Sequence, residues 1–75
     1  MVTIGEHYKH FKGKEYLVIA VGKDSDTLED VVVYQGQYNS KEFGDKPVWV
    51  RTLKDFISEK VFKDGSKVRR FMLIE

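Results

Sequence analysis

Apolar residues in this chain recur with a period of two, in short segments separated by turn-forming residues. A period of two is the spacing of side chains on one face of a β-strand, whereas an amphipathic helix repeats every 3.6 residues. Strand patterns of this kind occupy residues 7–11, 15–22, 31–35 and 48–50. A chain of 75 residues has room for one small core, so we expect a single β domain over residues 1–75.

Glycines mark two predicted hairpins. Gly13 follows the first segment and is suited to a positive-φ turn position, and Asp64-Gly65 separates two β-rich arms near the C-terminus. The segment 15–22 is apolar on both faces, which predicts a central and strongly curved strand. We therefore predict an all-β fold, a small barrel or roll of five or six short antiparallel strands.

One short helical turn is predicted near residues 53–58. Thr52, followed three residues later by Asp55, resembles a capping box, and Leu53, Phe56 and Ile57 have the spacing of one helix face. A helix of about two turns is not stable alone, so this face should lie across the mouth of the barrel. The predicted core is Leu17, Ile19, Val21, Val32, Val50, Leu53, Phe56 and Phe71, with Phe11 and Phe62 also inside.

No motif in the sequence indicates catalysis, a metal or a cofactor. The chain has no cysteine, and His7 and His10 are three residues apart, on opposite faces of a strand. The acidic segment 24–30 begins like a calcium loop but has Leu28 and Glu29 where a ligand and a glycine are needed. We expect no enzyme, since His10 is the only reasonable acid or base.

The sequence also predicts a complete, soluble and cytoplasmic protein, which we expect to be a monomer. No apolar stretch approaches the roughly 20 residues of a membrane helix. Net charge is +1, with an acidic centre at 24–45 between two basic ends. Ten aromatic residues are more than so small a core readily hides. Those with a polar atom suit half-buried positions at a rim: Tyr8, Tyr16, Tyr34, Tyr38 and Trp49.

The chain resembles a family of small bacterial and viral domains of unknown function, DUF1653, over nearly its whole length. The segments that match the family pattern are HYKHFKG at 7–13, SDTLEDVVVYQ at 25–35 and WVR at 49–51. Asp26 and Thr52 depart from it, where the family has glutamate and proline. The resemblance implies an SH3-like barrel or roll and brings no known activity, substrate or partner. An OB-like barrel and an α+β roll are the alternatives.

The family pattern contains a polar and aromatic set that we predict to be the ligand-binding site: Tyr8, His10, Lys12, Tyr34, Trp49 and Arg51. Residues 8, 10 and 12 share one strand face, and 49 and 51 share another. The set fits a ligand groove. It equally fits a structural cluster in which Arg51 stacks on Trp49 or Tyr34 and binds an acid of the 24–30 loop.

We therefore predict a non-enzymatic binding module for a protein or peptide partner. A nucleic-acid-binding small barrel is the alternative, and it would bring five cations onto one face: Lys9, Lys12, Lys67, Arg69 and Arg70. The near-neutral net charge and the acidic centre count against it.

Overall fold

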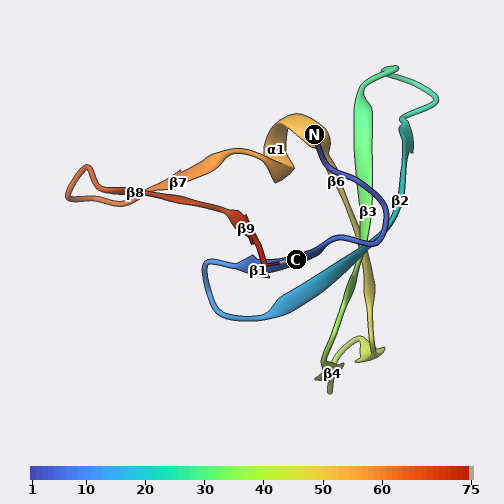
Figure 1. The fold of residues 1–75 in the computed structure, drawn as a ribbon, viewed down its shortest axis with the longest axis horizontal. Helices are drawn as coiled ribbons and strands as arrows, with labels where there is room; N and C mark the ends of the chain where they lie inside the picture. The colour runs from blue at the N-terminus through green and yellow to red at the C-terminus, as the bar shows by residue number, and fades with distance from the viewer. Residues whose placement is uncertain (75) are drawn as a thin grey trace.

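The computed structural model describes residues 1–74 and is mostly β. Five strands form one antiparallel sheet in the order β6-β3-β2-β1-β9, and two small hairpins, β4–β5 and β7–β8, lie outside it (Figure 1). The elements are β1 (His7–His10), β2 (Glu15–Lys23), β3 (Asp30–Gly36), β4 (Asn39–Ser40), β5 (Gly44–Asp45), β6 (Val48–Thr52), α1 (Leu53–Phe56), β7 (Glu59–Val61), β8 (Lys67–Arg69) and β9 (Phe71–Leu73).

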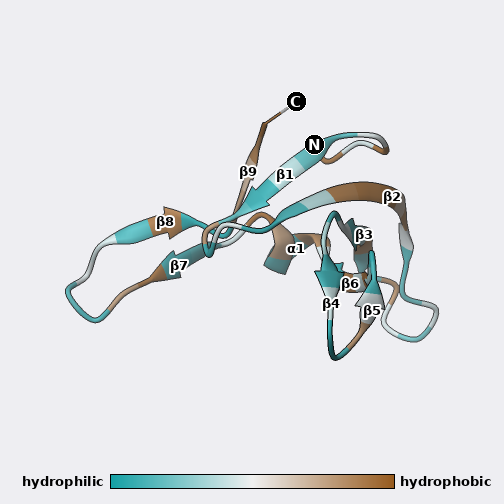
Figure 2. Cartoon of the chain, turned by 90° about the horizontal axis from the view of Figure 1, so that it is seen from below, coloured by the Kyte–Doolittle hydropathy of each residue, from teal (hydrophilic) through white to brown (hydrophobic). Residues whose placement is uncertain are grey.

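The sequence predicted a small barrel or roll, and a closed barrel is not found among residues 1–74. β6 and β9 are the two edges of the sheet, and no pairing between described strands joins them. Instead, β9 returns beside β1 and the β7–β8 hairpin projects away from the sheet (Figures 1 and 2). The long connection between β3 and β6 also contains a short hairpin, β4–β5.

The predicted turns are confirmed. β1 and β2 form an antiparallel hairpin in which Gly13 has φ 107°, and Gly65, with φ 88°, lies in the turn between β7 and β8. The helical cap is confirmed as well, because the Asp55 N–H donates to the Thr52 hydroxyl oxygen at 3.2 Å. The helix is one turn long rather than two. Its Phe56 is buried, but Ile57 is 52% exposed.

β2 is central, as predicted, and it contains a β-bulge. Val18 pairs with Tyr34 but Ala20 pairs with Val33, so Ile19 has no partner of its own. Two residues, Ile19 and Ala20, therefore oppose one, and the alternation of faces shifts at this point. Figure 2 shows the long curve of β2 and its apolar stretch, residues 17–21, within which the bulge lies.

The bulge explains why the predicted core face of β2 was wrong. Before it, the inward side chains are Tyr16 and Val18, so Leu17 points to the outer face and Ile19 sits in the bulge, 37% exposed. After it, Val21 shares the inner face with Val32 but lies near the end of the strand and is 48% exposed. The buried core is Val2, Tyr8, Val18, Val32, Tyr34, Phe56 and Phe71, with Leu53 packed against it.

β6 departs from the prediction in the same way. Its inner face carries Trp49 and Arg51, whereas Val50, expected in the core, is 62% exposed. Phe62, also expected inside, is 42% exposed on the β7–β8 hairpin, where its ring meets the half-buried Phe11 edge-on at 6.1 Å. The inner layer is thus built from aromatic rings: Phe56 and Phe71 stack with centroids 4.2 Å apart, and Tyr34 meets both rings edge-on.

Candidate functional site: an aromatic and cationic inner face

The predicted binding residues lie on the inner face of the sheet, with one exception. Tyr8 and Tyr34 are buried in the core, and His10, Trp49 and Arg51 are half-buried. Lys12 lies in the turn after β1 and is exposed. Residues 8 and 10 of β1 and residues 49 and 51 of β6 therefore each share a face, as their parity predicted, although the sequence had placed Val50 on the inside of β6. Whether these residues bind a ligand stays a prediction.

Arg51 connects the sheet to α1. Its Nε donates to the Tyr34 hydroxyl oxygen at 2.8 Å, and its NH1 forms an ion pair with Asp55. Its guanidinium carbon lies 5.7 Å from the Phe71 ring centroid. The prediction of an acid from the 24–30 loop was wrong: the partner is Asp55, because the capped helical turn brings a side chain four residues ahead back to the strand.

Arg70 approaches the same carboxylate from the other side. Its Nε donates to the Ser58 hydroxyl oxygen at 3.1 Å and lies 4.0 Å from the second carboxylate oxygen of Asp55. Arg70 is joined to the β1 turn as well, because its carbonyl accepts the Phe11 N–H at 3.0 Å. Two guanidinium groups therefore flank one carboxylate.

His10 faces this cluster. Its ring meets the Phe71 ring edge-on at 4.9 Å, and its Nδ1 accepts the Lys12 N–H at 3.1 Å. Because Nδ1 is an acceptor, the neutral ring carries its proton on Nε2. Burial lowers the pKa of His10, and the positive charges of Arg51, Arg70 and Lys12 lower this pKa further. His10 is thus held in its neutral form near neutral pH.

The buried tyrosines are difficult to ionise. Burial raises the pKa of Tyr8 to about 12, and its hydrogen bond to the Glu6 carboxylate, 3.0 Å long, adds to the effect. Burial also raises the pKa of Tyr34, although its bond to Arg51 acts in the opposite direction. These phenols are neutral hydrogen-bonding groups at physiological pH.

A second aromatic group extends the inner face toward the β4–β5 hairpin. Trp49 Nε1 donates to the Tyr38 hydroxyl oxygen at 3.1 Å, and the Tyr16 and Tyr38 hydroxyls are 3.2 Å apart. Phe43 meets Trp49 edge-on at 5.0 Å, and the Lys14 Nζ lies 4.4 Å from the Tyr38 ring centroid. We call Tyr16, Tyr38, Phe43 and Trp49 the aromatic strip.

Gly36 makes room for the Tyr38 ring in the aromatic strip. A Cβ at this position would lie 2.4 Å from a ring carbon of Tyr38, well inside van der Waals contact. The hairpin can fold its tyrosine over β3 only because residue 36 has no side chain.

The sequence prediction missed part of this face. Tyr16 and Tyr38 were expected at a half-buried rim, and they are half-buried. Phe43, Lys14, Asp55 and Arg70 were not assigned to the site. Phe43 and Lys14 come from turns and had no periodic signal, although the Thr52 cap pointed to a helical turn that would carry Asp55 back toward β6.

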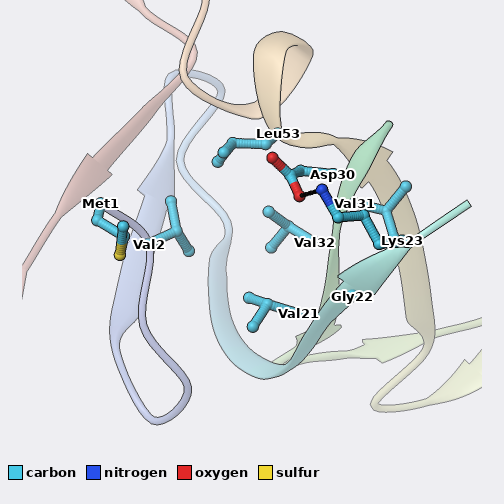
Figure 3. A pocket seen from close by; sticks show the side chains of 9 residues that line it. All are labelled: Met1, Val2, Val21, Gly22, Lys23, Asp30, Val31, Val32 and Leu53. Carbon is cyan, nitrogen blue, oxygen red and sulfur yellow. Dashed lines mark ion pairs between the residues drawn. The ribbon is translucent and has the colours of Figure 1, made fainter. Parts of the chain in front are cut away.

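An open pocket of about 270 Å³ lies near the other end of β3 (Figure 3). Its walls are aliphatic, with Val2, Val21, Val32 and Leu53 facing the space, and the Lys23–Asp30 ion pair, 2.7 Å long, lies at its edge. None of the predicted site residues lines it. Its chemistry is limited to apolar contact and one exposed ion pair.

The cations expected for nucleic-acid binding do not share one face. Lys9 alternates with Tyr8 and His10 and so points to the outer face of β1, whereas Arg70 is directed toward Ser58 and Asp55. Lys9 and Arg70 therefore do not lie on one face.

Fold and site together define a small, mostly β domain with an inner face of aromatic rings and paired guanidinium groups. Residues 6–73 match the family described as "Protein of unknown function (DUF1653)", and the chain belongs to this family. Comparison with curated proteins and with solved structures found no match. Within residues 1–74, no helix has the length and apolar character needed to cross a membrane.

Proposed function

We propose that this domain is a non-enzymatic binding module for a protein or peptide partner, and that the aromatic strip is its recognition surface. The observation that carries the proposal is the hydroxyl network among Tyr16, Tyr38 and Trp49. The polar atoms of these rings are satisfied by one another, so their apolar faces are fixed before any ligand arrives. Fixed aromatic side chains bind with a low entropic cost.

Exposure of the strip supports contact with a ligand. Phe43 is 57% exposed, and Trp49, Tyr38 and Tyr16 are each half-buried at the surface. Aromatic-lined grooves are a common means of binding extended, proline-rich peptides. The return of β9 beside β1 supports an SH3-like description of the roll, and SH3 domains use grooves of this kind.

Trp49 is the only tryptophan, so its fluorescence reports directly on the strip. The test is a titration of the protein with a panel of extended and proline-rich peptides, followed by Trp49 emission. We expect saturable binding by some of these peptides, with affinity that changes little with salt. Phe43→Ala should weaken binding, whereas Phe62→Ala, which removes another largely exposed phenylalanine, should not.

A single-stranded oligonucleotide is tested beside the peptides. Binding that falls steeply with salt, seen for the oligonucleotide alone, would replace the proposal with the nucleic-acid alternative. Equal binding by the Phe43→Ala and Phe62→Ala variants would remove the strip from the recognition surface.

A further inference from the structure

We propose that Arg51 and Arg70, with His10 beside them, form an oxyanion site that receives a carboxylate or phosphate group of the bound peptide. This inference rests on the proposed peptide-binding function and specifies the chemistry of the ligand. We call Arg51 and Arg70 the arginine pair.

The arginine pair carries more positive than negative charge, which favours the binding of an anion. Asp55 is the carboxylate between the two guanidinium groups, with an ion pair to Arg51 and a 4.0 Å approach to Arg70. The neutral His10 ring brings no charge, so two positive guanidinium groups stand against one carboxylate. A second oxyanion here would meet an excess of positive charge.

Hydrogen-bond donors remain for such a group. Arg51 uses Nε for Tyr34 and NH1 for Asp55, and Arg70 uses Nε for Ser58. Among residues 1–74, the terminal nitrogens of Arg70 and the NH2 nitrogen of Arg51 have no hydrogen-bonded protein partner. The His10 Nε2–H is a further donor, because Nδ1 is occupied by the Lys12 N–H.

The surroundings favour a strong but reversible contact. The Arg51 and Arg70 side chains are 30% and 22% exposed, so their charges are partly shielded from water yet can be reached from it. Charge–charge attraction is stronger under these conditions than between fully solvated groups. Guanidinium groups also suit flat carboxylates and phosphates, because they offer two parallel N–H groups.

The arginine pair is continuous with the aromatic strip. Trp49 and Arg51 are on the same face of β6, two residues apart, which corresponds to roughly 6.7 Å along a strand. An extended peptide that follows β6 would then contact Trp49 with an apolar residue and Arg51 with an acidic group about two positions away. This spacing predicts a peptide ligand that carries an apolar residue and an acidic group about two positions apart.

The test uses acetate and inorganic phosphate as probes, with chloride exchanged for the probe so that ionic strength is constant. The readouts are the NMR signals of the Arg51 and Arg70 Nε–H groups and the pKa of His10. We expect saturable shifts of these signals. We also expect the pKa of His10 to rise toward its ordinary value, because a bound anion offsets the neighbouring positive charges.

Two variants with the same change in charge provide the control. Arg70→Gln should weaken the binding of the probe by about tenfold or more, because a charge-assisted hydrogen bond is lost. Arg69→Gln removes a neighbouring guanidinium on exposed β8 and should leave the affinity of the probe within about twofold of wild type. A response to acetate supports a carboxylate ligand, and a response to phosphate alone supports a phosphorylated one.

The proposal is overturned if neither anion shifts the arginine signals more than chloride does, or if both variants bind the probe like wild type. Failure of the binding function is distinguishable from failure of the anion site. If no peptide binds but the probe saturates the arginine pair, anion binding at this site is supported and its role in peptide binding is contradicted. If peptides bind and Arg70→Gln has no effect on them or on the probes, the module stands and the anion site fails.

Discussion

The Nε of Arg51 donates a hydrogen bond to the hydroxyl oxygen of Tyr34, 2.8 Å away, and so attaches a half-exposed cation to one of the most buried rings of the core. The NH1 nitrogen of the same guanidinium group forms an ion pair with Asp55. Arg51 therefore has a structural role whether or not it also contacts a ligand, and this is why Arg70, rather than Arg51, is the residue to change in binding experiments.

Arg51→Ala should lower the free energy of unfolding by roughly 1–3 kcal/mol, because the buried Tyr34 hydroxyl loses its partner. The ion pair with the half-exposed Asp55 adds little, less than about 1 kcal/mol. Arg51→Lys should be intermediate, since lysine keeps the charge but lacks the planar fork. Urea unfolding of the three proteins measures the difference. A loss below about 0.5 kcal/mol for the alanine variant would contradict the structural role.

Phe56→Ala should cost about 3–5 kcal/mol and leave much of this small domain unfolded. The ring is 1% exposed and stacks on Phe71, so its removal opens a cavity in the centre of the inner layer. Ile19→Ala is the comparison, with an expected loss of less than about 1 kcal/mol, because Ile19 lies in the bulge and is 37% exposed. Thermal melts of both variants test the assignment, and equal losses would show that the inner and outer faces of β2 are assigned incorrectly.

Gly36→Ala should displace Tyr38 and break the aromatic strip, at a cost of roughly 1–3 kcal/mol for overpacking. The added methyl group would meet a rigid ring rather than the end of a flexible chain. Trp49 loses the oxygen that accepts its indole N–H, so its fluorescence should change together with stability. Gly22→Ala is the matched control, because a Cβ there meets nothing within 4 Å. An unchanged emission spectrum for Gly36→Ala would contradict the contact.

Stability should fall as pH rises from about 10 to about 12. Burial raises the pKa of Tyr8 from the ordinary 10.0 to about 12, so within this window the folded state holds a proton that the unfolded state has released. The stabilisation is complete below pH 10 and is lost through the upper value. Tyr8→Phe should flatten the dependence, with Tyr16 and Tyr34 left to contribute the rest, since burial also raises the pKa of each. Urea midpoints that fall equally steeply in both proteins would exclude Tyr8 as a source.

Local features of the fold could be predicted from the sequence because each depends on a few neighbouring residues. The Thr52 cap, the turn at Gly13 and the Asp64-Gly65 hairpin are of this kind. The parity of Trp49 and Arg51 on one strand likewise needs only the period of a strand. The same pattern could not say which face of β6 is inside, because valines lie on one face and an aromatic and a cation on the other.

The inner face was difficult to predict for a physical reason. Phe56 and Phe71 lie in the core as predicted, but Tyr34 packs beside them where aliphatic residues were expected, and its hydroxyl oxygen accepts a hydrogen bond from Arg51. The bulge at Ile19 leaves no mark in the sequence, since every residue around it is apolar. Contacts such as Phe43 with Trp49 depend on a hairpin whose position is set by tertiary packing rather than by periodicity.

The bulge gives β2 one residue more than its ladder with β3 needs. Deleting Ile19 would restore an unbroken ladder and keep every face, because Ala20 would still pair with Val33 and Val21 with Val32. An insertion in the 24–29 loop would leave every face as it is, because the ladder with β3 ends at the Lys23–Asp30 pair. Variation in chain length is therefore tolerated at the tip of this hairpin and at the bulge, whereas a one-residue change elsewhere in its ladder would move side chains to the opposite face.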